Sequence, residues 1–270
     1  MHCIILLEYT NQFLEEKSMS EHAAAHELEW DVSAWPLVIS IGILFLVPFA
    51  FAFQFVYHHS MVAVICLGIG VPLIILGIAG WVSEGIGGGH GPAGLSFPAM
   101  GWFILAEAMI FVSFFASYWF LRLSAPYWPP EGTVELPTIM PLIMTLVLVS
   151  SSFTIHFAEV KLEHNDRAGF KMWLGITMLL GAIFLSMSII EWTHLFHEGF
   201  AFWTNIYSTS FFTITGFHGA HVIVGLGIFI AILIPAILGK INDNFVKAGS
   251  LYWHFVDIIW FFVVSQVYYW

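Results

Sequence analysis

The chain has 270 residues, of which 59% are hydrophobic and only 9% are Asp, Glu, Lys or Arg. This composition excludes a water-soluble domain of this length and is typical of a membrane protein with several spans. The net charge of −11, with seven Lys and Arg in total, excludes a nucleic-acid-binding protein, and Cys3 and Cys66 match no disulfide framework or CxxC site.

The first 34 residues differ from the rest because they are polar and acidic. A single lysine, Lys17, stands among the carboxylates Glu8, Glu15, Glu16, Glu21, Glu27, Glu29 and Asp31. The short apolar run 3–7 has no basic residues before it, so we do not expect a secretory signal peptide, and Met19 is an alternative start. We predict an acidic arm over residues 1–34.

Seven stretches after this arm are long and apolar enough to cross a bilayer, which takes about 20 residues. They cover residues 35–57, 61–83, 99–122, 136–160, 168–192, 207–238 and 247–269. We predict an all-α membrane protein in which 35–83 forms a two-helix hairpin, 84–98 a glycine-rich loop and 99–270 a five-helix bundle. No internal repeat is visible, which disfavours a transporter built from inverted repeats.

The distribution of Lys and Arg predicts how the spans are oriented. With seven spans, the side that holds the N-terminus collects Lys17, Lys161, Arg167, Lys171, Lys240 and Lys247, whereas the other side has Arg122 alone. We therefore expect the N-terminus in the cytoplasm and the C-terminus on the outer side.

Two acidic residues within the spans attract attention because ionisable groups are costly there. Glu107 lies roughly 12 Å from the inner end of its span, at 1.5 Å per residue. It either pins two helices together or exchanges protons or contacts lipid. Asp257 lies three residues after His254 on one helix face, and this spacing favours a local carboxylate–imidazole pair.

The histidines of "GFHGAHVIVG", His218 and His221, lie near the middle of the sixth span. Their spacing places both rings on one face, too close for two stacked haems, and the small residues around them favour close helix packing with polar bonds across the contact. We therefore predict that they tie helices together. Glu191, His194 and His197 have a better spacing for a metal site, but they lie at a membrane boundary, where such residues are common. We therefore expect no metal site, and we expect Glu191, like Asp257, to make a polar contact between helices.

Three stretches resemble one family. "GFHGAHVIVG", "YWHFVDIIWFF" with the terminal "YYW", and "ILAEAMIFVSFF" are similar to subunit III of the haem-copper cytochrome c oxidases. "WDVSAWPLVISIG" and "EGIGGGHG" add support, and "EWTHLF" resembles the bacterial members. The resemblance runs from about residue 30 to residue 270, but the loop before the third span lacks the paired basic residues often seen in the family.

The resemblance implies a subunit that binds no haem or copper itself. Subunit III packs beside the catalytic subunit I, near the entrance of a proton-uptake path, in a complex with subunit II whose electron donor is cytochrome c. Haem and copper belong to the partner subunits. The first two helices lean away from the other five and leave a V-shaped cleft that holds structural phospholipid. The family pattern makes Glu107 the acid that faces this cleft, and it places His90, Trp253 and His254 near lipid or helix contacts.

We therefore expect a non-catalytic subunit of a proton-pumping oxidase in the inner membrane of a bacterium. It would support proton uptake and the lipid environment of subunit I. The acidic arm with His22, His26 and His164 is either a proton-collecting surface or a merely solvated tail. Three alternatives stay open: a quinol oxidase, a nitric oxide reductase, or a stand-alone haem b cytochrome of the membrane.

Overall fold

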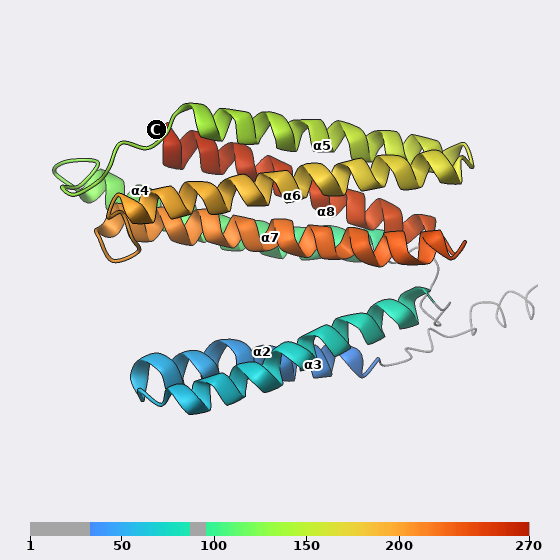
Figure 1. Cartoon of the computed structure of the whole chain (residues 1–270), viewed down its shortest axis with the longest axis horizontal. Helices are drawn as coiled ribbons and strands as arrows, with labels where there is room; N and C mark the ends of the chain where they lie inside the picture. The colour runs from blue at the N-terminus through green and yellow to red at the C-terminus, as the bar shows by residue number, and fades with distance from the viewer. Residues whose placement is uncertain (1–32, 87–95, 270) are drawn as a thin grey trace, which may run out of the picture. The chain divides into compact units, whose positions relative to one another are not determined.

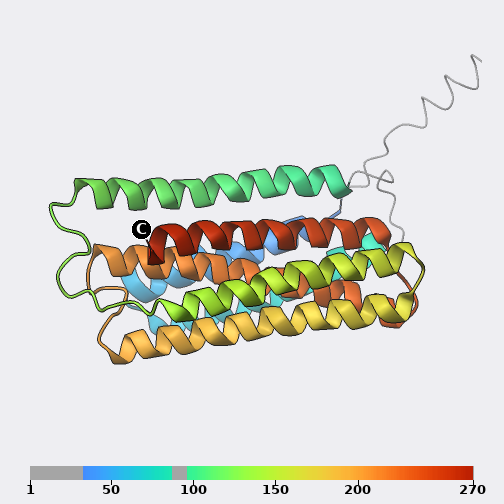
Figure 2. The same cartoon turned by 90° about the horizontal axis from the view of Figure 1, so that it is seen from above.

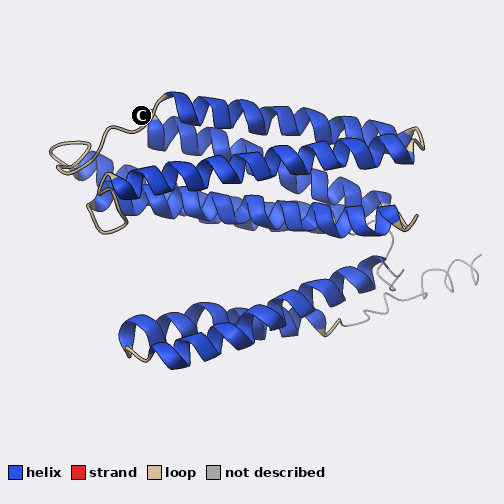
Figure 3. Cartoon of the chain, in the orientation of Figure 1, coloured by secondary structure: helices blue, strands red, loops and turns tan. Residues whose placement is uncertain are grey.

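The computed structural model describes residues 33–86 and 96–269, and within them it contains helices and loops but no strand (Figure 3). Seven helical segments in these ranges are long and apolar enough to cross a membrane, which confirms the all-α, seven-span prediction. The chain divides into two compact units, Met1–Ala93 and Gly94–Trp270.

Within residues 33–86, the described part of the first unit, there are two membrane-length helices. One is α2, Trp35–Leu44, continued by the π-helical segments η1, Phe45–Phe49, and η2, Ala52–Val56; the other is α3, Ser60–Ile86. Pro48 lies inside η1, and because proline has no N–H to donate, it interrupts the regular α-helical hydrogen bonds there.

Glycines allow the two helices of this unit to approach closely. A Cβ atom added at Gly70 would lie 2.8 Å from the carbonyl oxygen of Gly42 and 2.8 Å from the backbone nitrogen of Leu46. Only a residue without a side chain fits such a distance, which is how small residues bring membrane helices together.

The second unit contains five helices and a C-terminal π-helical segment. They are α4, Ser96–Ser124; α5, Ile139–Glu163; α6, Arg167–His197; α7, Ile206–Ile237; α8, Asp243–Val263; and η3, Val264–Tyr268. The loops from α4 to α5 and from α6 to α7 lie at one end of this unit, and the turns from α5 to α6 and from α7 to α8 lie at the other (Figure 1).

Helix α8 is the centre of the second unit. It packs against α4, α5 and α7, and Figure 2 shows it between α4 and α5. In an 18-residue apolar stretch of its span, 67% of the residues are buried, against 33% or less in the corresponding stretch of each of the other six spans. The buried polar side chains of α8, Ser250 and Asp257, therefore face neighbouring helices.

Two helix ends differ from the predicted spans by four or more residues. Helix α8 begins at Asp243, four residues before the predicted start, because the side chain of Asn242 accepts a hydrogen bond from the Phe245 N–H. Helix α6 continues to His197, five residues beyond the predicted end, so Glu191 does not close the helix but lies inside it.

Candidate functional site

Glu107 and His221 form an ion-pair contact between α4 and α7. Glu107 Oε2 lies 3.1 Å from His221 Nε2, and the two side chains are 19% and 10% exposed. His221 Nδ1 lies 2.8 Å from the carbonyl oxygen of Phe217, which can only accept, so Nδ1 carries a hydrogen. The contact with Glu107 must then hold one further proton, either on the carboxyl or on the imidazole. The pair is neutral as a whole in both cases.

Aromatic side chains surround this pair. The rings of Phe217 and Phe111 lie 4.7 and 5.0 Å from the ring of His221, and the Tyr252 hydroxyl of α8 donates to the His221 carbonyl oxygen over 3.3 Å. The low-polarity surroundings strengthen the contact between Glu107 and His221. The structure thus brings together two residues that were expected to act separately.

His218 lies on the same helix but has a different environment. It is 1% exposed, and its Nε2 lies 3.2 Å from the carbonyl oxygen of Val256 on α8. The rings of Trp260 and Phe184 pack around it, and its Nδ1 has no hydrogen-bond partner among the described residues. His218 therefore links α7 to α8 through a single backbone bond.

His254 and Asp257 are joined through a third residue, Ser152 of α5. The Ser152 hydroxyl donates to Asp257 Oδ2, and its oxygen lies 3.2 Å from His254 Nδ1. Trp253 also bonds to α5, since its Nε1 donates to the hydroxyl of Ser151 over 2.9 Å. Sequence reasoning missed both serines, although the run "SSS" at 150–152 inside an apolar span was a visible signal.

Glu191 is buried within the bundle and bonds to the C-terminal segment. It is 4% exposed, its Oε2 accepts a 2.8 Å hydrogen bond from the Tyr268 hydroxyl, and its Oε1 has no partner among the described residues. The metal-like spacing with His194 and His197 does not produce a metal cluster in the parts of the chain that the structure describes. His194 instead lies 3.5 Å from Glu198, and its side chain is mostly exposed.

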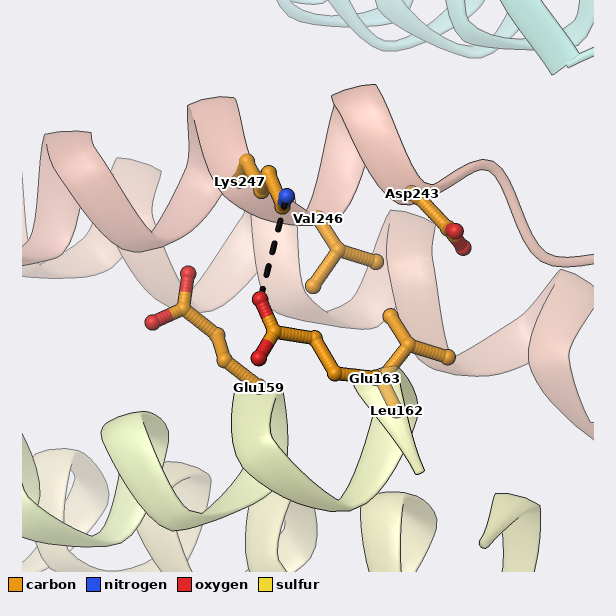
Figure 4. A pocket seen from close by; sticks show the side chains of 6 residues that line it. All are labelled: Glu159, Leu162, Glu163, Asp243, Val246 and Lys247. Carbon is orange, nitrogen blue, oxygen red and sulfur yellow. Dashed lines mark ion pairs between the residues drawn. The ribbon is translucent and has the colours of Figure 1, made fainter. Parts of the chain in front are cut away.

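A pocket opens between α5 and α8 at the end of the unit that holds the α5–α6 turn. Six residues line it (Figure 4): Glu159, Leu162, Glu163, Asp243, Val246 and Lys247. Lys247 Nζ lies 3.9 Å from Glu163 Oε1. We call this the acidic pocket, because its lining contains three carboxylates and one ammonium group.

The predicted proton-collecting residues are only partly described. His22 and His26 lie outside the described residues, as does His90. His164 follows α5 in the turn to α6; it is exposed, and its Nδ1 lies 2.7 Å from the Val160 carbonyl oxygen.

Asp166 caps the N-terminus of α6 in the same turn. The N–H of Gly169, and then the ammonium of Lys161 at 3.1 Å, lower the pKa of the Asp166 carboxyl below its usual value. The cap therefore contributes stability at neutral pH, and this contribution is lost as the pH falls through the lowered pKa.

Comparisons with known proteins point to one family. The family model for cytochrome c oxidase subunit III matches residues 26–270. Cytochrome c oxidase subunit 3 of a Synechocystis species is 37% identical over 185 residues, which are 67% of this chain and 78% of the relative. Its counterpart in Thermostichus vulcanus is 36% identical over 62% of this chain and 83% of the relative. That of Xenopus laevis is 30% identical over 93% of this chain and 99% of the relative.

Proposed function

Because this chain belongs to the cytochrome c oxidase subunit III family, we propose that it is a non-catalytic membrane subunit of a proton-pumping cytochrome c oxidase. In this proposal, haem and copper reside in the partner subunits I and II. This chain packs against subunit I and supports its proton uptake and its lipid environment. The relatives are named as subunits of cytochrome c oxidases, which favours cytochrome c over a quinol as the electron donor of the complex.

The observation that carries the proposal is that polar side chains within the bundle form hydrogen bonds between helical segments. Glu107 bonds to His221, Asp257 to Ser152, Glu191 to Tyr268, and His218 to the backbone of α8. Each bond joins two helical segments. Groups used in this way hold helices together, which supports a subunit that stabilises a complex rather than one that converts a substrate.

A lipid contact at α4 is supported by an exposed apolar face of this helix. Trp102, Met109 and Phe120 on this helix are each at least 60% exposed, and an exposed apolar face within a span packs against acyl chains. Glu107 lies on another side of α4, against His221 of α7, and its side chain is 19% exposed. We propose that structural phospholipid covers the exposed apolar face of α4.

The proposed contribution of this chain to proton uptake is supported by titratable side chains at one end of the second unit. The acidic pocket and His164 lie at that end, and carboxylates and imidazoles of differing pKa can hold and pass protons at neutral pH. We propose that this end faces the cytoplasm and delivers protons toward the partner subunit.

The test compares the purified oxidase with and without this chain. We expect the complex that lacks the chain to reduce O₂ with cytochrome c as donor, but to take up protons more slowly at high pH and to lose activity during turnover. Adding the chain back should restore both properties. Unchanged proton-uptake kinetics, or iron or copper bound by His218, His221, Glu191 or Glu107, would contradict the proposal.

The identity of the complex is tested by its other chains. A co-purifying copper-binding subunit II supports cytochrome c as electron donor, whereas its absence from an active complex would favour the quinol-oxidising alternative. A Soret band from this chain alone would favour the haem b cytochrome.

A further inference from the structure

Ser152 connects two titratable residues in a defined direction. Its hydroxyl has one hydrogen, which it donates to Asp257 Oδ2. The contact with His254 Nδ1 at 3.2 Å must then use a hydrogen of the imidazole. When Asp257 is ionised, the result is an ordered series of hydrogen bonds in which Nδ1–H of His254 donates to Ser152, and Ser152 donates to Asp257.

The carboxyl group of Asp257 lies at the buried end of this series of hydrogen bonds. The residue is 5% exposed, and its Oδ1 has no partner among the described residues. An unpaired negative charge within a membrane span is costly, so the neutral acid suits this environment, and it requires a proton. Hydrocarbon offers no route for that proton, whereas the hydrogen bond from Ser152 does.

The His254 end of this series of hydrogen bonds leads toward the acidic pocket. His254 is half-buried and lies within electrostatic range of Glu159 and His156 on α5. Glu159 in turn lines the pocket, where Figure 4 shows its carboxylate beside that of Glu163 and the ammonium of Lys247.

Helical spacing places these groups in two facing rows. On α5 the row is Ser152, His156, Glu159 and Glu163, at steps of four, three and four residues; on α8 it is Asp257, His254, Ser250, Lys247 and Asp243, at steps of three or four. Ser250 is 1% exposed, and its hydroxyl has no partner among the described residues. It adds a hydrogen-bonding group on the same face of α8, between His254 and the pocket.

We propose that His254, Ser152 and Asp257 form a proton relay that loads the buried carboxyl of Asp257 from the acidic pocket. A hydronium ion at the pocket protonates His254 at Nε2. The imidazolium then releases its Nδ1 proton to Ser152 Oγ, while the Ser152 proton moves to Asp257 Oδ2. The products are neutral His254 in its other tautomer and neutral Asp257; no electrons move, and the reverse steps unload the carboxyl.

The relay predicts something that a purely structural bond does not. If Ser152 only ties α5 to α8, the proton on Asp257 exchanges when the bundle opens, and the side chain of His254 has no influence on the rate. If the relay operates, exchange requires both the hydroxyl of Ser152 and the imidazole of His254.

The experiment measures deuterium exchange of the Asp257 carboxyl in the intact oxidase by infrared spectroscopy. The variant Asp257→Asn identifies the carboxylic-acid C=O band of this residue. Transfer to D₂O should shift that band quickly in the unmodified complex. We expect Ser152→Ala and His254→Phe each to slow the shift by about 10²-fold, the scale on which a positioned proton-transfer group acts, and Ser152→Thr, which keeps a hydroxyl, to restore it.

Glu191 provides the matched control, because it is equally buried and bonds to a single hydroxyl, that of Tyr268. Its band, identified with Glu191→Gln, should exchange at the same rate in all relay variants. Three results would overturn the relay: no carboxylic-acid band lost in Asp257→Asn, an exchange rate unchanged in Ser152→Ala and His254→Phe, or equal slowing at Asp257 and Glu191.

Discussion

At the scale of single residues, Glu107, Asp257 and Glu191 each have a partner that lies far away in the sequence. Glu107 and His221 are 114 residues apart, Ser152 and Asp257 105, and Glu191 and Tyr268 77. Hydropathy and local spacing identify the costly residue, but they contain no information about which helix face it meets. The sequence therefore predicted the first member of each bond and missed the second whenever that member was a serine or a tyrosine.

The pair of Glu107 and His221 should behave as a coupled unit. We expect Glu107→Leu and His221→Phe each to lower the stability of the complex by about 1–3 kcal/mol, because each leaves a nearly buried polar atom unpaired. The double variant should lose less than the sum, since both polar atoms are then removed. Thermal unfolding of the purified complex measures the three values.

Two further variants control for this pair. Glu107→Gln should cost only about 0.5 kcal/mol, because the amide can donate to His221 Nε2. Ser113→Ala, on the same helix, should be similarly mild, since the Ser113 hydroxyl bonds only within its own helix, to the Ile110 carbonyl oxygen. Strictly additive effects in the double variant would mean that the two side chains do not interact.

At the scale of helices, the sequence predicted the existence of every span but placed several ends inaccurately. Apolar length determines where a helix can cross a membrane. The helix ends depend on capping groups instead. The side chain of Asn242 caps α8 and starts it early. Helix α6 continues through residues 191–197, and Gly199, whose φ is +83°, follows its end. Such capping signals are short, and apolar counting does not register them.

The contact between α2 and α3 makes a prediction at this scale. Gly70→Ala should weaken their packing by about 1–3 kcal/mol, because its Cβ would meet the backbone of Gly42 and Leu46 at 2.8 Å. Hydrogen exchange of residues 35–44 in the purified complex should therefore become faster. Gly68→Ala is the matched control, since nothing lies within 4 Å of a Cβ at Gly68. Equal exchange in the two variants would exclude close packing at Gly70.

At the scale of the whole molecule, basic residues gather at one end of the second unit. Lys161, Arg167, Lys171, Lys240 and Lys247 lie in or beside the turns from α5 to α6 and from α7 to α8, whereas Arg122 lies near the opposite end of α4 (Figure 1). This separation supports the orientation proposed from the sequence, in which the lysine-rich end faces the cytoplasm.

Thiol labelling can test this orientation. In a chain whose native cysteines are replaced by serine, a reagent that cannot cross membranes should label Glu131→Cys in right-side-out vesicles and Lys240→Cys in inside-out vesicles. Both side chains are exposed, so accessibility depends on the side of the membrane alone. The opposite labelling pattern would reverse the proposed topology and place the acidic pocket on the outer side.

The central position of α8 has a consequence for biosynthesis. The ribosome makes α4, α5 and α7 before α8. Until α8 is inserted, the Ser152 hydroxyl and the carbonyl oxygen of His221 lie in the membrane without their final hydrogen-bond partners. Insertion of the last span is then the step that closes the bundle. A chain truncated before residue 243 would keep the other six spans, but the four remaining helices of the second unit would lack the helix that packs against α4, α5 and α7, and we expect membrane proteases to degrade it.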